Sequence, residues 1–431
     1  MFAELRPPLS PEAAAVEADR CLECGGPYAS APCTLACPAG VDIPAFVAAV
    51  AAGDPAGAGR VIFAENLLGG TCARVCPVEV LCEGACVLEH EGRRPIAIGS
   101  LQRFAADTAL GDGTVLRERA PDSGRVVAVV GAGPAGLACA GELAALGHSV
   151  IVYDERREVG GLVRYAIAPY RQLSDPLSAE ARLLQDLGVE LRLGTPVDAP
   201  GALEALAQEF DAVFLGVGMG ADAELNLPGE GLPGVWDSLP FIEALKSGNL
   251  LHTGRRVVVI GGGNTAIDVA RESIRLGADL VTVLYRRTRA EMPAYEFEVE
   301  EAEEEGIHFQ WLAAPVRFVG DRRLEGVECI AMTLGEPGPD GRRRPEPVEG
   351  SKFLLAAETA VKAVGQQARL ELAESIEGAE FEHGILKVDP LTRQIDGTNF
   401  FAGGDVINGG ASVVEAVRDG KRAAHAIDEW L

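Results

Sequence analysis

The sequence predicts an α/β protein that begins with an all-helical segment. A hydrophobic strand, a glycine-rich turn and a helix follow one another at residues 125–155 and again at residues 255–288. Eight of the ten cysteines lie between Cys21 and Cys86, before the first of these repeats. Strand, glycine turn and helix in this order are typical of nucleotide-binding α/β domains, and 431 residues are enough for about three domains.

The charge balance and the N-terminal residues limit the partners and the location. Asp and Glu number 64 against 38 Lys and Arg, so the net charge of -26 would repel a nucleic acid, and we expect no nucleic-acid partner. Residues 1–20 lack the apolar stretch of a signal peptide, and the longest apolar run, residues 126–140, is too short to cross a bilayer. We therefore expect a cytoplasmic protein with no membrane partner, where clustered cysteines bind metal or do redox chemistry.

The clustered cysteines form two groups of four with distinct spacing. The first group reads CxxC, eight residues, CxxxCP, and the second reads CxxxCP, five residues, CxxxC. The members are Cys21, Cys24, Cys33 and Cys37, then Cys72, Cys76, Cys82 and Cys86. Zinc sites prefer CxxC pairs or mixtures with His, whereas short intervals closed by Cys-Pro are typical of iron-sulfur ligands. Eight thiols suit two 4Fe-4S clusters, with zinc and disulfides as alternatives.

Helical spacing accompanies both cysteine groups. One apolar face between the groups is formed by Ile43, Phe46, Val47 and Val50. A second, after Cys86, is formed by Leu101, Phe104, Ala105 and Thr108. We predict an all-α domain over residues 1–120, whose short helices fold one cysteine group over the other.

The first glycine turn predicts a dinucleotide site. Gly131, Gly133 and Gly136 form GxGxxG directly after a strand, and Asp154 ends the next strand 18 residues after Gly136. Glycines let backbone amides at a helix N-terminus approach a pyrophosphate, and the acid can hold ribose hydroxyls. The alternative is a glycine-rich turn without a ligand.

The second glycine turn predicts a second nucleotide. Gly261, Gly263 and Ala266 form GxGxxA, and the following strand ends in Arg286 and Arg287 where the first repeat has an acid. Arginines can bind a 2'-phosphate, so we assign this site to NADPH, with NADH possible. Surface arginines without a ligand role are the alternative.

The C-terminal residues indicate that the first nucleotide fold is split. Gly404 and Asp405 follow a strand, and a helix begins near Ser412; a carboxylate there can bind ribityl hydroxyls, and a helix N-terminus can stabilise negative charge on a reduced flavin. We predict an FAD-binding domain at residues 125–245 and 363–431, with an NADPH-binding domain inserted at 246–362. The crossovers are expected at residues 211–218 and 359–366.

The acidic run at residues 296–306 predicts a solvated helix face. It carries seven glutamates and no His, and metal-binding carboxylates would have to converge. The segment 336–350 is expected to be a surface hairpin loop.

Taken together, these motifs resemble the small subunit of glutamate synthase and the N-terminal half of dihydropyrimidine dehydrogenase, along nearly the whole chain. The cysteine groups, "GAGPAGLACA", "GGGNTAIDVAR", "YRRTRAEMPA" and "FAGGDV" occur in the order of that family. The resemblance implies a split FAD domain, an inserted NAD(P)H domain and two 4Fe-4S clusters.

The resemblance also implies individual ligands. One cluster would be held by Cys21, Cys24, Cys33 and Cys86, and the other by Cys37, Cys76, Cys82 and Gln102. Cysteine counting alone would instead use Cys72. Further nucleotide-binding residues implied by the family motifs are Pro134, Ala135, Gly160, Gly161, Leu162, Arg171, Gly218, Asn264, Thr265, Asp268, Ser412 and Val413. Two departures are the long gap between Cys24 and Cys33, and Ala166 and Ala168 where many relatives have Gly and Pro.

The resemblance implies an electron-input subunit. NADPH would reduce FAD, and electrons would pass through the clusters to a catalytic partner. No side chain is predicted as an acid or base, because the cofactors carry this chemistry. Gln102 favours an FMN-containing dihydropyrimidine dehydrogenase as the partner; the alternatives are the large (alpha) chain of NADPH-dependent glutamate synthase, or no partner, in a stand-alone NAD(P)H:ferredoxin-type oxidoreductase.

Overall fold

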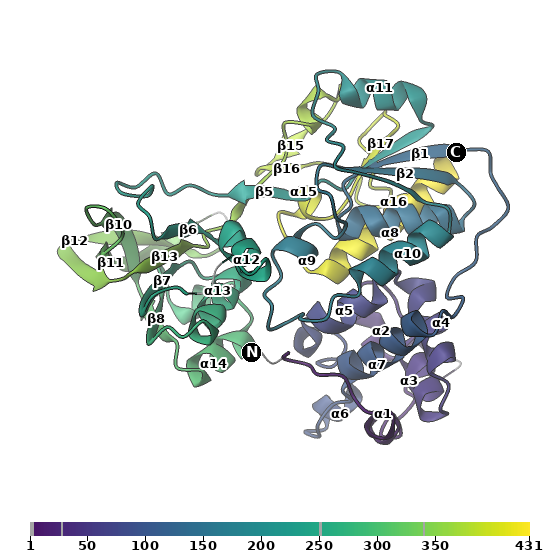
Figure 1. Cartoon of the computed structure of the whole chain (residues 1–431), viewed down its shortest axis with the longest axis horizontal. Helices are drawn as coiled ribbons and strands as arrows, with labels where there is room; N and C mark the ends of the chain where they lie inside the picture. Colours follow the sequence, from purple (N-terminus) through teal and green to yellow (C-terminus); the bar gives the residue numbers. More distant parts are fainter. Residues whose placement is uncertain (1–3, 27–28, 250–251, 339–340) are drawn as a thin grey trace. The chain divides into compact units, whose positions relative to one another are not determined.

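The computed structural model describes residues 4–26, 29–249, 252–338 and 341–431 (Figure 1). These residues form two compact units. The larger unit comprises residues 4–167, 171–219 and 368–431, and the smaller unit comprises residues 168–170 and 220–367.

The N-terminal part of the larger unit is helical. Ser10, Asp42 and Asp54 each precede a helix and accept a hydrogen bond from a backbone N–H in its first turn, with a proline at one of the first two helical positions. The helices are α1 (Pro11–Ala18), α2 (Pro32–Leu35), α3 (Ile43–Ala51), α4 (Pro55–Glu65), α5 (Gly69–Val75), α6 (Val87–His90) and α7 (Ile98–Gly111), with a 3-10 turn at Val78–Val80. The predicted apolar face of α3 is confirmed, because its four residues are all buried.

A parallel sheet with strand order β17-β4-β1-β2-β3 forms the rest of the larger unit. Its strands are β1 (Val126–Val130), β2 (Ser149–Asp154), β3 (Glu190–Leu193), β4 (Ala212–Leu215) and β17 (Phe400–Ala402). Val127 and Val129 face α8 (Pro134–Ala145) and α16 (Val413–Trp430), which lie side by side (Figure 1). Ala128 and Val130 face the opposite core, as the two-residue period of a strand requires.

Shorter elements complete this unit. They are α9 (Leu162–Tyr165), α10 (Leu177–Asp186), α11 (Ala202–Glu209), a 3-10 turn at Ala373–Ser375, β15 (Phe381–Glu382), β16 (Ile385–Leu386) and α15 (Asp405–Asn408). The N-cap of α16 is Ser412, whose hydroxyl forms a capping box with Glu415. The predicted start of this helix is therefore confirmed.

The smaller unit contains a second parallel sheet, with strand order β6-β13-β7-β8-β9. Its strands are β6 (Val235–Asp237), β7 (Arg256–Ile260), β8 (Leu280–Tyr285), β9 (His308–Trp311) and β13 (Thr359–Lys362). One face is covered by α12 (Ser238–Lys246), α13 (Asn264–Arg275) and α14 (Glu296–Glu304). A 3-10 turn at Arg289–Glu291 precedes α14.

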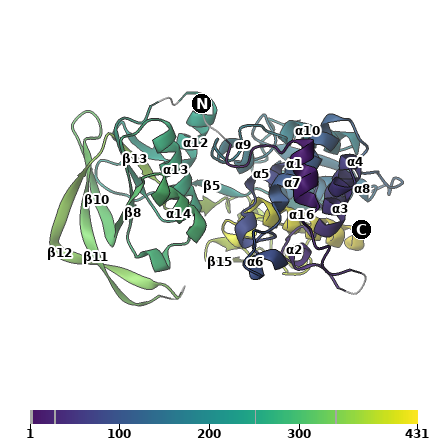
Figure 2. The ribbon, with the colours of Figure 1, turned by 90° about the horizontal axis from the view of Figure 1, so that it is seen from below.

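An antiparallel sheet covers the other face of β7. It consists of β10 (Ala313–Val319), β11 (Gly326–Pro337) and β12 (Arg343–Ala356), which lie side by side (Figure 2). Its Phe318 and Val327 share a core with Val258 and Ile260. The loop predicted at residues 336–350 is longer than the observed connection, because β11 continues to Pro337 and β12 already begins at Arg343; within the connection, Pro339 and Asp340 lie outside the described residues.

The crossovers differ from the prediction by a few residues. β4 and β13 lie inside the two parallel sheets, and the chain passes between the units at β5 (Met219–Asp222) and β14 (Gln366–Ala368) just after them. The smaller unit begins at Gly220, before the predicted residue 246, because β6 pairs with β13 and so belongs to that sheet. No helix among the described residues is long and apolar enough to cross a membrane.

Candidate functional site

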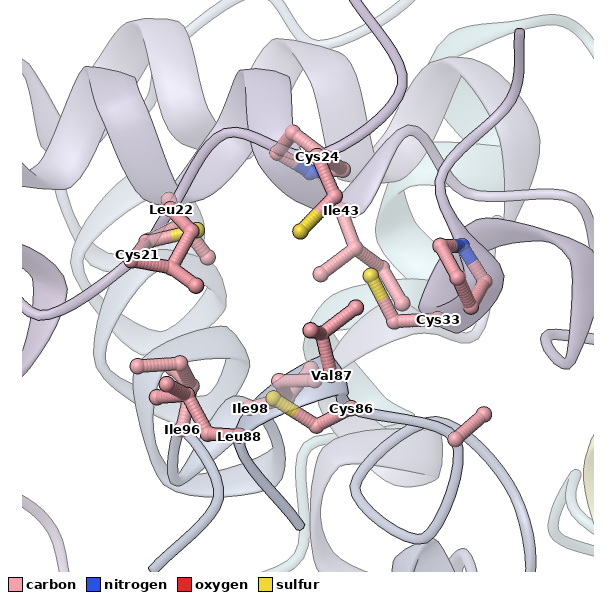
Figure 3. Close-up of a pocket in the computed structure, with 14 residues that line it drawn as sticks. Cys21, Leu22, Cys24, Cys33, Ile43, Cys86, Val87, Leu88, Ile96 and Ile98 are labelled. Atoms are coloured by element: carbon pink, nitrogen blue, oxygen red, sulfur yellow. The ribbon is translucent and has the colours of Figure 1, made fainter. Parts of the chain in front are cut away.

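Four thiols from both cysteine groups surround one pocket in the helical part. Figure 3 shows Cys21, Cys24, Cys33 and Cys86 with their sulfur atoms turned toward the central space. The remaining lining residues are apolar: Leu22, Pro32, Ile43, Pro44, Val47, Ala85, Val87, Leu88, Ile96 and Ile98. The structure thus brings together the four residues expected to hold the first cluster.

The apolar lining of the pocket affects the pKa of the thiols that it surrounds. Burial raises the pKa of Cys33 to about 11 and also raises the pKa of Cys21. A thiolate there requires a compensating positive charge, which bound iron supplies. Within the described residues, no three or more His, Cys, Asp or Glu side chains converge as the ligands of a single ion do. The thiols are spread around a wall, an arrangement that suits a cluster in which each thiolate binds a separate iron.

A second set of thiols lies close together in the same helical part. The pKa of Cys76 is raised well above its usual value, first by a hydrogen bond with the Cys72 side chain and then by burial and by the charges of Cys82 and Cys37. Burial likewise raises the pKa of Cys37 and of Cys82. These four thiols therefore interact, and Cys72 belongs to the group.

Gln102 is held by the backbone beside this second set. Its Nε2 donates to the carbonyl oxygen of Gly69 at 2.8 Å, three residues before Cys72. This bond assigns the amide orientation and leaves Oε1 as the atom able to bind a metal. Gln102 and Cys72 therefore both remain candidates for the fourth ligand of the second cluster.

Glu83 is a buried acid that sequence reasoning missed. Burial raises its pKa to about 7, and its carboxylate accepts a hydrogen bond from Gly99 N at 2.9 Å. It follows Cys82 directly, and it fixes the start of α7, the helix that carries Gln102. The signal in the sequence was a charged residue between two predicted ligands.

The first glycine turn meets two other predicted segments in the larger unit. Gly131 has φ of +105°, and a Cβ atom there would lie 2.4 Å from the Gly216 carbonyl oxygen. Gly160 N donates to Ala132 O at 2.8 Å, and a Cβ on Gly161 would lie 3.0 Å from Gly133 Cα. A Cβ on Gly404 would lie 2.9 Å from that of Ala135. The turn, the Gly160–Leu162 loop and the Gly404–Asp405 corner are therefore one site.

Two acids border this site. The Asp154 carboxylate accepts from Ala132 N at 2.6 Å and Arg156 N at 2.7 Å, which holds it against the glycine turn. Burial raises the pKa of Asp405, and Ala411 N donates to it at 3.2 Å. Nothing lies within 4 Å of a Cβ built on Gly218, so that side of the loop is open.

The second glycine turn, in the smaller unit, has the same construction. Gly261 has φ of +147°, and a Cβ there would lie 2.0 Å from the Ala363 carbonyl oxygen, whereas a Cβ on Gly263 would meet nothing within 4 Å. The first glycine is thus required by chain packing, and Gly263 leaves open space at the start of α13, where backbone can approach a pyrophosphate. Asn264 and Thr265, in the first turn, are half-buried, and Asn264 Oδ1 accepts from Tyr295 N at 2.9 Å.

The two predicted arginines differ in their surroundings. Arg286 is exposed after β8, whereas Arg287 is buried and its Nε donates to the Arg343 carbonyl oxygen at 2.8 Å. Arg343 itself pairs with Glu291. The hairpin of β11 and β12 thus holds Arg287 in place.

Asp268 is engaged by a residue that sequence reasoning missed. It accepts a hydrogen bond from the Tyr170 hydroxyl at 2.5 Å, and Tyr170 has no exposed surface. Its sequence context gave no signal for this contact, because Tyr170 directly precedes the predicted Arg171 and nothing in the local pattern indicates α13 as its partner.

Comparison with known families agrees with this arrangement. The family described as pyridine nucleotide-disulphide oxidoreductase matches residues 125–420. The family described as dihydropyrimidine dehydrogenase domain II, 4Fe-4S cluster, matches residues 1–114.

Individual proteins are similar to most or all of the chain. The glutamate synthase [NADPH] small chain of Azospirillum brasilense is 37% identical, over 100% of this chain and 91% of that protein. The NADP(+)-dependent formate dehydrogenase subunit beta of Moorella thermoacetica is 37% identical over 94% of this chain, which spans 60% of that subunit. The structure of Mycobacterium tuberculosis FprA in complex with NADPH superposes with a TM-score of 0.59 at 21% identity, over 72% of this chain and 84% of that one, and supports the fold.

Proposed function

Because this chain belongs to the pyridine nucleotide-disulphide oxidoreductase family, we propose that it is the electron-input subunit of an NADPH-dependent glutamate synthase. The chain is an oxidoreductase with an FAD- and NADPH-binding fold and an iron-sulfur region. The finer assignment, to a partner, rests on its relatives and on the site.

The pocket of four thiols carries the proposal. Cys21, Cys24, Cys33 and Cys86 come from both ends of the helical part and meet on one apolar wall (Figure 3). Cys139 is the cysteine that the described part of the larger unit has outside the two cysteine groups. It is buried in α8, and no cysteine stands near it in the sequence to form a redox disulfide. Clusters held by the two cysteine groups, rather than a dithiol, would therefore carry electrons out of the flavin domain.

The residues of this chain fit each cofactor. The Gly131–Gly136 turn, the Gly160–Leu162 loop and the Gly404–Asp405 corner would hold FAD, with Asp154, Arg171, Gly218, Ser412 and Val413 around it. Asn264, Thr265, Arg286 and the Gly261–Gly263 turn would hold NADPH. When bound, FAD accepts the two electrons of a hydride and releases them singly, which one-electron clusters require. The protein itself would bind and orient the two cofactors and exclude water from them.

The choice of partner differs from the preference drawn from Gln102. A glutamate synthase small chain matches over 100% of this chain and 91% of its own length. The resemblance to dihydropyrimidine dehydrogenase is to a family model that matches residues 1–114. These likenesses favour a large amidotransferase chain. The similarity to a formate dehydrogenase subunit supports a second possibility, in which this chain passes electrons to a different catalytic partner.

An anaerobic purification from native cells tests the proposal. A large co-purifying chain, with NADPH-dependent conversion of glutamine and 2-oxoglutarate to glutamate, is the expected result. A compact FMN protein with uracil reduction would overturn the partner in favour of pyrimidine reduction. If NADPH does not bleach the flavin absorbance of the anaerobic protein, the oxidoreductase role itself is wrong.

A further inference from the structure

One face of α13 in the smaller unit carries four charged side chains that are buried or partly buried. Asp268, Arg271, Glu272 and Arg275 follow one another at helical spacing and so lie on the same face. Charged groups are rarely buried without partners. One residue that contacts all four of them is Tyr170, 98 positions before Asp268 in the sequence.

The hydroxyl, the backbone N–H and the ring of Tyr170 all contact this face. Its hydroxyl donates to Asp268 Oδ1 at 2.5 Å, and its backbone N–H donates to Glu272 Oε1 at 3.0 Å. The guanidinium carbons of Arg271 and Arg275 lie 4.7 and 4.6 Å from the ring centroid, within the range of cation–π attraction.

The arginines are themselves held from α14 and the residue after it. Arg271 donates to Glu301 at 2.7 Å and to Glu305 at 2.6 Å, and Arg275 donates to Glu305 at 2.7 Å. The ring of Tyr170 therefore sits in a rigid frame of ion pairs. Removing the tyrosine would take a hydrogen-bond donor from the buried Asp268 carboxylate and the ring contact from both arginines, and this loss opposes local opening.

The position of Tyr170 in the chain connects its contacts with α13 to the segment proposed for FAD. Residues 168–170 belong to the same compact unit as α13, whereas the chain up to Ile167 and from Arg171 onward belongs to the other unit. Gly160, Gly161, Leu162 and Arg171 are the residues proposed for FAD. Asp268 lies one turn after Asn264 and Thr265, which are proposed for NADPH.

We propose that Tyr170 is a positioning residue that couples occupancy of the two nucleotide sites. A nucleotide at the first turn of α13 orders the helix that holds Tyr170, and the anchored tyrosine in turn restricts the loop that contacts FAD. Such coupling is a free energy shared by both sites, so it acts in both directions. The inference rests on the proposed function only in needing both nucleotides to bind.

The test uses the full chain with its cofactors and oxidised NADP+, so that no chemistry occurs. The temperature at which bound FAD is released, read as a rise in flavin fluorescence, is measured with and without NADP+. For the unaltered chain, NADP+ at a hundred times its dissociation constant should raise the release temperature by about 5 °C. Tyr170→Phe keeps the ring but removes the hydroxyl, and should lose more than half of that shift while the FAD content and the affinity of the FAD-free chain for NADP+ stay unchanged.

Tyr153→Phe is the matched control. It also removes a hydroxyl from a buried ring that lies against an arginine, since Tyr153 is bonded to Arg192 at 2.8 Å with the guanidinium 5.4 Å from the ring. The control should keep the full shift, because a purely structural loss would affect both variants alike.

Three outcomes would overturn the inference. They are an undiminished shift in Tyr170→Phe, an equal loss in Tyr153→Phe, and no shift in the unaltered chain although both nucleotides bind. If Tyr170→Phe does not retain FAD, Arg275→Gln, which removes one cation from the ring, replaces it and must show a reduced shift. If calorimetry finds no NADP+ binding to the unaltered chain, the proposed function falls as well, which separates the two failures.

Discussion

At the scale of single residues, Glu180 is a carboxyl group without exposed surface. It lies on α10 and accepts hydrogen bonds from Thr71 N at 2.9 Å and Thr71 Oγ1 at 2.5 Å. Burial raises its pKa to about 7, against the opposing effects of the Thr71 bonds and of Arg74. The folded protein therefore favours the neutral acid.

This gives a pH dependence of stability with a defined sign. Between pH 4.5 and about 7 the folded chain holds a proton at Glu180 that the unfolded chain has released. The stability due to this group is thus full below pH 4.5 and lost as pH rises through 7, by up to about 3 kcal/mol. In thermal unfolding, Glu180→Gln should lose about 2 kcal/mol less stability than the unaltered chain between pH 5.5 and pH 7.5. Glu204→Gln, an exposed change, should keep the original profile; identical profiles for both variants would contradict the assignment.

Arg286 and Arg287 show what a sequence pattern can and cannot distinguish. The strand and turn before them were predictable from hydrophobicity and glycine spacing, and so was the position of a basic pair. Which arginine stays at the surface depends on the Arg343 carbonyl in a hairpin far along the chain, and local spacing carries no information about it.

The difference can be measured in kinetics. Arg286→Gln should raise KM for NADPH about tenfold and leave KM for NADH nearly unchanged, because only a 2'-phosphate needs the guanidinium. Arg287→Gln should instead lower the unfolding temperature, since its buried bond to Arg343 is lost. Equal effects of Arg286→Gln on both coenzymes would refute the coenzyme assignment.

At the scale of elements, the predicted solvated face of α14 is confirmed in part, since Glu296, Glu300, Glu303 and Glu304 are exposed. A run of seven glutamates is expected to be a solvated face, yet Glu298 is buried and other acids pair with arginines. Arg289 contacts Glu296 and Glu303, and Arg271 contacts Glu301 and Glu305. The pattern of charges predicted the helix. The arginines that pair with its glutamates lie on α13 and before α14, so only the folded structure brings the two together.

The ion pairs between these glutamates and arginines differ in burial, and so in their expected contribution to stability. Glu305 binds both Arg271, which is almost wholly buried, and Arg275. Glu305→Gln should lower the free energy of unfolding by about 2 kcal/mol, because a buried guanidinium loses its charged partner. Glu300→Gln, whose exposed carboxylate lies 3.9 Å from Arg289, should change it by less than about 0.5 kcal/mol. Denaturant unfolding would compare the two; equal losses would mean that burial does not set the strength.

At the scale of the whole molecule, the two parallel sheets, their glycine turns and the helical cysteine region were predictable from periodicity and spacing. The passage points at Gly220 and Gln367 were not, because a short strand such as β6 does not reveal which sheet it joins. The partner was also beyond the sequence pattern, since its identity depends on a surface of another chain and one ligand residue cannot indicate it.

Metal loading tests the helical region as a whole. Two clusters imply about eight irons per chain, and Cys33→Ser should lower this to about four, because Cys33 lines the first pocket and the second group keeps its own ligands. Cys329→Ser, in the smaller unit, should keep the full content. Iron analysis and the spectrum of the reduced protein give the answer; unaltered iron in Cys33→Ser would remove that residue from the ligand set.

The pairing of β17 with β4 sets an order of events during synthesis. β4 ends at Leu215, and its neighbour in the sheet begins only at Phe400. At ribosomal rates of roughly 5 to 20 residues per second, one side of β4 waits on the order of ten to forty seconds for its partner. The smaller unit emerges and can fold during that interval, while the nascent sheet keeps an open hydrogen-bonding edge. Chaperone protection of this edge, rather than the stability of the finished protein, would then govern how much active enzyme a cell obtains.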